Sequence, residues 1–178
     1  MAYYITYGQF QRRMKEYYLA TGSRLQFPEM VEMLWKRGEL SPERPSTVSP
    51  KSMFNRMSDE EFEEIINNLV LTLTPSQVLS TEVEEDDIIP KERDVFIIRH
   101  PRYTRHLMHS HNYFEINFVA TGQCSLFFEK EKHTLKTGEL CIIAPNSMHD
   151  LQINDDDTTV FCIMIRKSTF NHSFYSEL

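Results

Sequence analysis

The sequence is short of several residue types, and each shortage excludes a class of protein. The 5 glycines among 178 residues form no phosphate-binding loop. The 3 cysteines, Cys124, Cys141 and Cys162, lie in apolar runs. Their odd number argues for buried, reduced thiols of a cytosolic protein, and against a disulfide framework. With 19 basic and 26 acidic residues the net charge is −7, so the chain as it stands is a poor DNA binder.

Long hydrophobic runs are also missing. No stretch of about 18 apolar residues would cross a membrane, and the N-terminus lacks the basic and apolar regions of a signal peptide. Hydrophobic residues make up 40% of the chain and charged residues 25%, which is ordinary for a globular protein. We therefore expect a cytoplasmic protein with no membrane contact.

The pattern divides the chain into a helical segment, residues 1–90, and a strand-rich domain, residues 91–170. In the first segment, helical spacing predicts one helix that ends at Gly22 and a second that runs from Pro28 to Gly38. The side chains expected on their buried faces are Phe10, Met14, Tyr17 and Tyr18 in the first helix and Met30, Val31, Leu34 and Trp35 in the second.

A third helix is predicted to begin at Ser58, because Ser58 and Glu61 have the spacing of a capping box. Its apolar stripe would extend from Phe62 to Leu73, before Pro75 ends it. We interpret the Pro-rich residues 41–50 as an extended linker and the acidic residues 82–87 as a solvated linker.

From residue 91 onward, short apolar runs alternate with turn residues every 8 to 12 positions, which predicts a β-sandwich or small barrel. Residues 171–178 are expected to begin a C-terminal helix or linker. The predicted strands are Val95–Ile98, Tyr113–Ala120, Gln123–Phe128, His133–Lys136, Leu140–Ala144, His149–Ile153 and Thr159–Ile165.

The candidate site is the motif that contains His109, His111, Tyr113 and Glu115. Alternate residues of a strand share a face, so these four side chains are expected to point the same way. His149, from a separate strand, would join them. The candidate ligand-binding residues are therefore these five, and His109, His111, Glu115 and His149 suit a divalent metal such as Zn, Fe, Mn or Ni. Three interpretations remain open: a metal site, a polar pocket for a small effector, and a purely structural cluster.

Two motifs carry a resemblance to a known family. His109, His111, Glu115 and Gly122 resemble the first motif of the cupins, and the segment from Gly138 through Pro145 to His149 resembles the second. The stretches around them are similar to the N-terminal sensor domain of the arabinose-regulator (AraC) family of transcription factors. The resemblance implies an α+β, mainly β fold: a cupin-like double-stranded β-helix, or jelly-roll barrel, preceded by the helical segment.

The resemblance further implies an effector-sensing, dimerising domain that binds a small molecule, possibly a sugar, in the barrel. Its DNA-binding domain would be missing, and we expect a chain truncated before the helix-turn-helix motifs. Tyr103 occupies a position where metal-binding cupins usually have glycine, and the second motif is shortened before His149. These departures favour an effector pocket over a closed metal shell. A metal-dependent cupin enzyme, of the dioxygenase or isomerase type, is the alternative.

If Glu115 faces the interior, the strand's other side chains face outward. Phe114, Ile116 and Phe118 would then form an apolar outer surface, which is not expected to stay exposed to water. We expect either the Phe62–Leu73 helix or a partner subunit to cover it. A β-bulge near Tyr113 would reverse the assignment.

Overall fold

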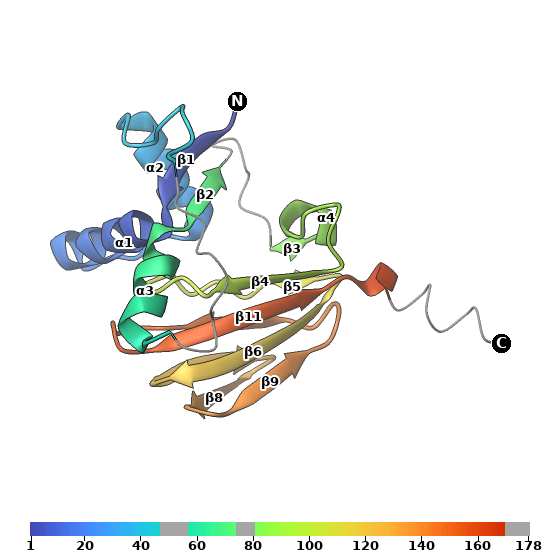
Figure 1. Cartoon of the computed structure of the whole chain (residues 1–178). Helices are drawn as coiled ribbons and strands as arrows, with labels where there is room; N and C mark the ends of the chain where they lie inside the picture. The colour runs from blue at the N-terminus through green and yellow to red at the C-terminus, as the bar shows by residue number, and fades with distance from the viewer. Residues whose placement is uncertain (47–56, 74–80, 170–178) are drawn as a thin grey trace. The chain divides into compact units, whose positions relative to one another are not determined.

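The structure, a computed structural model, describes residues 1–46, 57–73 and 81–169 (Figure 1). The chain divides into two compact units, Met1–Leu79 and Ser80–Leu178. The predicted boundary lay near residue 90, whereas these two units meet between residues 79 and 80. Residues 81–89 belong to the second unit because they pair with its strands and hold Arg166, as shown below. The predicted C-terminal element, residues 171–178, and residues 47–50 of the predicted linker 41–50 lie outside the described residues.

The sequence pattern predicted that the first unit is helical. In the structure this unit also contains two strands. Strand β1 (Tyr3–Thr6) pairs antiparallel with β2 (Val70–Leu73), and α1 (Tyr7–Thr21), α2 (Phe27–Lys36) and α3 (Asp59–Asn68) accompany them. The predicted third helix was therefore too long. Its last apolar residues leave the helix at Asn68 and form β2, because the N-terminal strand pairs with each of residues 70–73.

The ends of the helices follow local sequence signals. Ser58 and Glu61 form the predicted capping box of α3, in which the Glu61 amide donates to Ser58 Oγ at 3.2 Å. Gly22, with φ of 69°, ends α1 as predicted. Phe10, Met14, Met30 and Leu34 form the core of this unit. Trp35, predicted to be buried, is 44% exposed and meets Tyr3 only edge-on.

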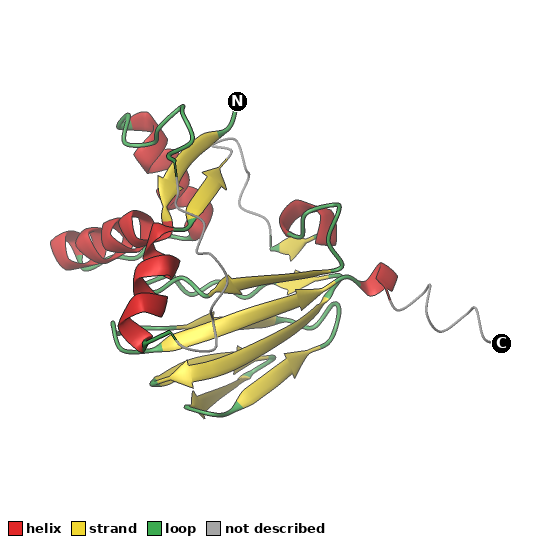
Figure 2. Cartoon of the chain, in the orientation of Figure 1, coloured by secondary structure: helices red, strands yellow, loops and turns green. Residues whose placement is uncertain are grey.

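The second unit is a barrel of two antiparallel sheets (Figure 2). One sheet has the order β4-β11-β6-β9 and the other β10-β7-β8. The order interleaves strands that are distant in sequence, as a jelly roll requires, and confirms the mainly β, cupin-like fold class. The strands are β4 (Val95–Arg99), β6 (Phe114–Thr121), β7 (Gln123–Phe128), β8 (Glu131–Lys136), β9 (Leu140–Ile143), β10 (His149–Gln152) and β11 (Thr159–Ile165).

Two shorter strands and a helix complete this unit. Strand β3 (Glu82–Val83) runs parallel to β5 (Ser110–His111), and α4 (Glu85–Ile88) follows β3. The acidic run is therefore not the solvated linker that its composition suggested. Its carboxylates have partners that lie far away in the sequence, including Arg166, and composition alone does not reveal such partners.

The two faces of β6 alternate as predicted. Glu115, Asn117 and Val119 are buried, whereas the side chains between them point to the outer face. On that face, Ile116 lies in a row of four isoleucines that runs across the whole sheet: Ile142, Ile116, Ile163 and Ile97. What covers this outer surface stays a prediction, because α3 and the sheet belong to different units. In the described residues, no helix combines the length and apolarity that a bilayer span requires.

Candidate functional site

Three of the predicted side chains meet inside the barrel. His111 of β5, Glu115 of β6 and His149 of β10 have ligand atoms that all lie within 4.8 Å of one another. His111 Nε2 is 3.3 Å from Glu115 Oε2, and His149 Nε2 is 3.7 Å from Glu115 Oε1. Their exposed fractions are only 2%, 6% and 1% in chain order. Both sheets therefore contribute to one buried polar cluster, which we call the His–Glu cluster.

The turn between β9 and β10 brings His149 to this cluster. Asn146 has φ of 65°, a left-handed conformation that asparagine tolerates better than most residues. Its amide donates to the His111 carbonyl at 2.7 Å. His109 and His149 then exchange two backbone hydrogen bonds, each of 2.9 Å. These contacts dock the second motif onto the first, so the shortened turn still delivers His149 to the cluster.

The ring nitrogens of the two cluster histidines have different roles. His111 Nδ1 lies 2.9 Å from the Tyr113 carbonyl, and His149 Nδ1 lies 2.9 Å from the Ser147 carbonyl. A carbonyl only accepts, so each Nδ1 carries the proton and, in a neutral ring, each Nε2 presents a lone pair. Within the described residues, neither Nε2 has a partner in hydrogen-bond geometry, although the Glu115 carboxylate is near. The cluster therefore offers buried electron pairs to a ligand.

The electrostatics of the cluster favour a negative Glu115. Burial by itself would raise the pKa of Glu115, but its contacts with His111 and His149 hold that pKa well below its usual value. Burial would lower the pKa of His149, and the contact with Glu115 outweighs it, so the net shift is upward. A buried carboxylate beside two imidazoles attracts a proton or another cation. A metal ion binds the neutral form of an imidazole, so metal affinity should fall as the pH drops through the raised pKa of His149.

His109 borders the cluster without joining its three converging ligand atoms. Its ring centroid is 4.4 Å from that of His149 and 6.2 Å from that of His111. Its Nδ1 lies 3.2 Å from the Leu107 carbonyl, and the side chain is only half-buried. Burial, and then the charge of His149, lower the pKa of His109. His109 therefore lies beside the three converging ligand atoms, and its role as a fourth ligand stays a prediction.

Tyr113 supports the cluster from the side. Its ring stacks on that of His111, with centroids 3.9 Å apart and planes 7° apart, while its carbonyl faces His111 Nδ1. The side chain is 3% exposed and packs in a core cluster with Ile89, Cys162 and Met164. Burial raises the pKa of its hydroxyl. Tyr113 thus orients His111, a role that the pattern of alternating side chains did not predict.

Sequence reasoning missed two further residues. Asn117 is fully buried and donates from Nδ2 to Glu115 Oε1 at 2.7 Å, which orients the carboxylate. Its position two residues after Glu115 on the same strand was an available signal. The second is His100: burial lowers its pKa, and the charges of Glu115 and His149 also act on it. No local signal marks His100, which directly follows β4 and whose amide donates to the Val160 carbonyl at 2.8 Å.

Two surface hollows among the described residues are formed by other parts of the chain. One follows the acidic face of α3, and the other lies along α2. Neither is lined by residues of the His–Glu cluster. The candidate site is therefore defined by its converging polar atoms.

The fold and cluster define a cupin-like domain with two histidines and a glutamate at its centre. Residues 95–174 match the family model described as the AraC-like ligand binding domain. A search of curated proteins found no match.

Several solved structures are similar to part of the chain. KdgF from Halomonas sp. is 21% identical, over 43% of this chain and 75% of its own, with a TM-score of 0.37. A cupin protein from Bacteroides fragilis is 26% identical, over 42% of this chain and 66% of its own, with a TM-score of 0.35. The DMSP lyase DddQ from Ruegeria pomeroyi DSS-3 is 16% identical, over 41% of this chain and 38% of its own, with a TM-score of 0.35.

Proposed function

We propose that residues 80–178 form the effector-sensing domain of an AraC-type transcription regulator and bind a small molecule at the His–Glu cluster. The match of residues 95–174 to a ligand-binding domain supports this proposal. The single observation that carries it is the set of buried, unpaired Nε2 atoms of His111 and His149 beside the Glu115 carboxylate. Buried polar groups normally have partners, so such unpaired atoms point to a ligand.

The chemistry of the cluster restricts the ligand. The two Nε2 lone pairs and the Glu115 oxygens are acceptors, and Glu115 carries a negative charge. A ligand that binds here supplies positive charge or hydrogen-bond donors. A metal ion, an amine and a polyhydroxylated molecule such as a sugar all meet this condition. A free carboxylate or phosphate group does not meet it, because it would face another buried anion.

The same residues fit a divalent metal, which keeps the enzyme alternative open. Two imidazoles and one carboxylate suit Zn, Fe, Mn or Ni. Both histidines hold Nδ1 against a backbone carbonyl, the orientation that metal-ligating histidines usually have. His111, Glu115 and His149 would hold the metal, which would supply Lewis acidity, and His109 would lie at its edge. A metal-dependent cupin enzyme of the dioxygenase or isomerase type is therefore the second candidate.

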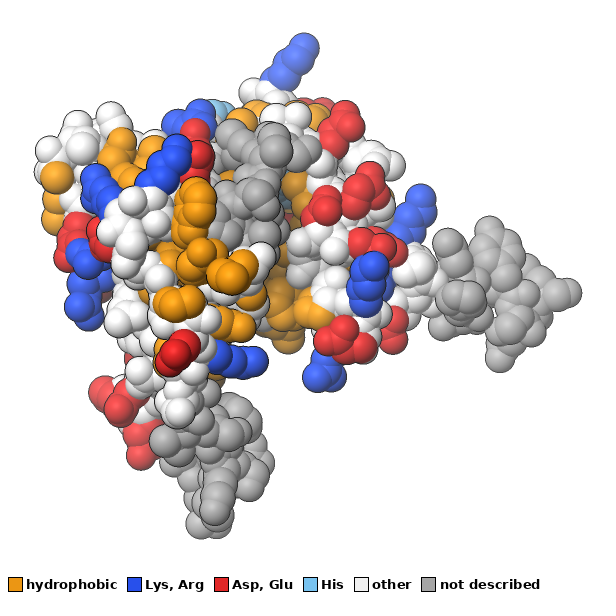
Figure 3. All heavy atoms as spheres, turned by 90° about the horizontal axis from the view of Figure 1, so that it is seen from above, with side chains coloured by type: hydrophobic (Ala, Val, Ile, Leu, Met, Phe, Trp, Pro, Cys, Tyr) orange, Lys and Arg blue, Asp and Glu red, His pale blue; other side chains and the backbone are white. Residues whose placement is uncertain are grey.

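In the sensor proposal, this domain also dimerises, and a separate domain binds DNA. The outer isoleucine row of the larger sheet is a surface on which a partner would pack. The net charge of −7 disfavours DNA binding by this chain itself. On the face seen in Figure 3, the basic side chains of the described residues are scattered among acidic ones.

Metal analysis and thermal shift together test the two candidates. The 178-residue chain would be purified without chelator or nickel resin, analysed for metals, and titrated with Zn²⁺ and Mn²⁺. Removing a ligand is expected to weaken metal binding by more than the roughly 10–100-fold that loss of an outer-shell partner costs. The informative variants are His111→Ala and the nearly isosteric Glu115→Gln. The control is His133→Ala, whose side chain is about half exposed and lies on β8.

The outcomes separate the proposals. The effector site is supported if a compound raises the melting temperature of the metal-free protein but not that of the Glu115→Gln variant. Stoichiometric metal that is lost in Glu115→Gln and kept in His133→Ala supports a metal centre. If turnover of a substrate accompanies the metal, the enzyme candidate gains. If neither metals nor donor-bearing compounds bind, the site proposal is wrong.

A further inference from the structure

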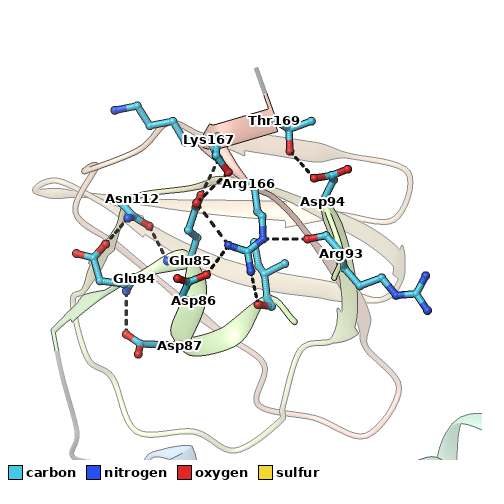
Figure 4. A network of polar contacts seen from close by, with 12 residues as sticks. Glu84, Glu85, Asp86, Asp87, Arg93, Asp94, Asn112, Arg166, Lys167 and Thr169 are labelled. Carbon is cyan, nitrogen blue, oxygen red and sulfur yellow. Dashed lines mark hydrogen bonds and ion pairs between the residues drawn. The ribbon is translucent and has the colours of Figure 1, made fainter. Parts of the chain in front are cut away.

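Three segments that lie far apart in the sequence meet beside the His–Glu cluster. Residues 81–89, which we call the strap, contain β3 and α4. On one side the strap contacts residues 110–112, which include the site residue His111, and on the other side residues 166–169, which directly follow β11. Figure 4 shows the polar contacts that join these segments. Their geometry connects the site to the point where the chain leaves the barrel.

Backbone and side-chain bonds attach the strap to the site. The Ser110 amide donates to the Thr81 carbonyl at 2.8 Å, and the Asn112 amide donates to the Val83 carbonyl at 3.2 Å. Asn112 Oδ1 accepts from the Glu85 amide at 2.7 Å, and Asn112 Nδ2 donates to the Glu84 carboxylate. Asn112 stands between His111 and Tyr113, whose rings stack on each other. A shift of these rings would therefore move the start of α4.

The Glu85 carboxylate attaches the strap to the exit of the chain. Its Oε2 accepts from the Lys167 amide at 2.9 Å, and its Oε1 accepts from Ser168 Oγ at 3.0 Å. Residues 167–169 are helical, and Glu85 supplies a partner to an amide at the start of this turn. The same residue thus contacts Asn112 through its backbone and the exit through its side chain.

Arg166 makes this arrangement sensitive to the position of the strap. Its side chain is only 8% exposed. Nη1 lies 2.7 Å from Asp86 Oδ1, Nη2 donates to the Ile89 carbonyl at 2.7 Å, and Nε donates to the Arg93 carbonyl at 2.9 Å. A buried guanidinium that loses one of these partners is left with an uncompensated charge or an unpaired N–H group, which destabilises the protein. If α4 moved, Arg166 would lose two of them together, so strap and exit are expected to move as one.

From these contacts we infer that the strap transmits the state of the His–Glu cluster to residues 167–169. The inference rests on the proposed ligand-binding function and adds a route by which binding changes the start of whatever follows β11. Coupling of this kind is reciprocal: a change at the exit alters affinity at the site by the same factor. Typical coupling factors are about 5 to 150.

The first experiment needs no ligand. Hydrogen exchange of single amides would be measured by NMR in the full chain and in Asn112→Ala. The Lys167 amide is expected to exchange at least about fivefold faster in the variant. The reference is the Val119 amide, which donates to the Glu139 carbonyl at 3.0 Å away from the strap. An unchanged Lys167 rate, or an equal change at Val119, overturns the inference.

The second experiment uses Zn²⁺ alone as the probe. Glu85→Ala should change the affinity of the chain for Zn²⁺ at least about fivefold. The control Glu92→Ala removes a nearby exposed carboxylate and should leave the affinity unchanged. Glu85→Gln serves in the same way if Glu85→Ala fails to fold. Equal Zn²⁺ affinity in the parent and the Glu85 variant contradicts the coupling.

The two experiments also separate this inference from the proposed function. If Zn²⁺ binds neither the parent nor the variants, the metal proposal is wrong, and the Asn112→Ala exchange result alone decides the inference. If Zn²⁺ binds and neither comparison shows a change, the site stands and the inference is wrong.

Discussion

Gly122 joins β6 to β7 with φ of +74°, a conformation that residues with a side chain rarely adopt. A Cβ added at this position would lie 2.8 Å from Thr158 Cα and closer still to Thr158 Oγ1. We predict that Gly122→Ala strongly destabilises the barrel. Gly138 provides a matched control, because its φ is +86° and nothing lies within 4 Å of an added Cβ.

The expected magnitudes follow from these two environments. Gly138→Ala carries only the backbone cost of a left-handed conformation, about 1–2 kcal/mol. Gly122→Ala adds an overpacking cost of about 1–3 kcal/mol. It also displaces the Thr158 hydroxyl, which bonds the amide and the carbonyl of Gln123 at 3.1 Å each. Losing one such bond costs about 1 kcal/mol more. Gly122→Ala should therefore be about 2–4 kcal/mol less stable than Gly138→Ala.

The three cysteines provide an assay that is confined to the barrel. Cys124, Cys141 and Cys162 all lie in the second unit, so pulsed thiol labelling against urea reports its unfolding. With a slope of about 2 kcal/mol per molar urea, the midpoints of the two variants should differ by about 1–2 M. Equal midpoints would refute the argument, because the contact with Thr158 would then have no energetic consequence.

Three further predictions concern local features. Phe10 is fully buried and packs 4.6 Å from the ring of Phe27, so Phe10→Ala should cost about 3–5 kcal/mol, whereas Leu19→Ala, at a side chain 70% exposed, should cost less than about 0.5 kcal/mol. Ser58→Ala should lower the free energy of unfolding by about 1 kcal/mol, because the helix α3 loses its cap. Urea unfolding, followed by the fluorescence of the single tryptophan, measures all three variants. Equal midpoints for Phe10→Ala and Leu19→Ala would contradict the assigned core. Burial, with a smaller effect of a neighbouring thiol, raises the pKa of Cys124 from 9.0 to about 12. At pH 8, labelling of Cys124 in the native protein should therefore be roughly 10³-fold slower than labelling of an exposed thiol. If Cys124 is labelled as fast in the native protein as in urea, this prediction is wrong. The pKa of Cys124 is higher in the folded than in the unfolded protein. Its contribution to the free energy of unfolding is therefore fully present below pH 9.0 and is lost as the pH rises from there towards 12.

Much of the barrel was predictable, because its signals are local. The alternation along Phe114–Thr121 reflects which side chains face the core, and it correctly placed Glu115 inside and Phe118 outside. Strands β7 and β11 have the predicted bounds, since turn residues delimit them. The capping box at Ser58 also formed, because it needs only residues three apart.

The errors share one cause, which is a partner distant in sequence. Residues 70–73 have an apolar pattern that suits a helix, and only the strand Tyr3–Thr6 makes them a strand. The acidic run resembles a solvated linker until Arg166, 80 residues away from Asp86, neutralises part of it. His100 belongs to no motif, and the charges of Glu115 and His149 act on it although both lie far from it in the sequence.

From the sequence by itself, strand periodicity predicted a sandwich or small barrel, and the resemblance of two motifs to the cupins predicted its class and the chemical types at its centre. Both signals are available because they lie in neighbouring residues. Only the tertiary structure decided that the ligand atoms of His111, Glu115 and His149 converge, with the ring of His109 beside that of His149. It also showed that Tyr113 and Asn117 orient the ligand atoms and that residues 81–89 connect the site to the chain's exit. These relations depend on how strands from two sheets approach one another, which no local pattern encodes.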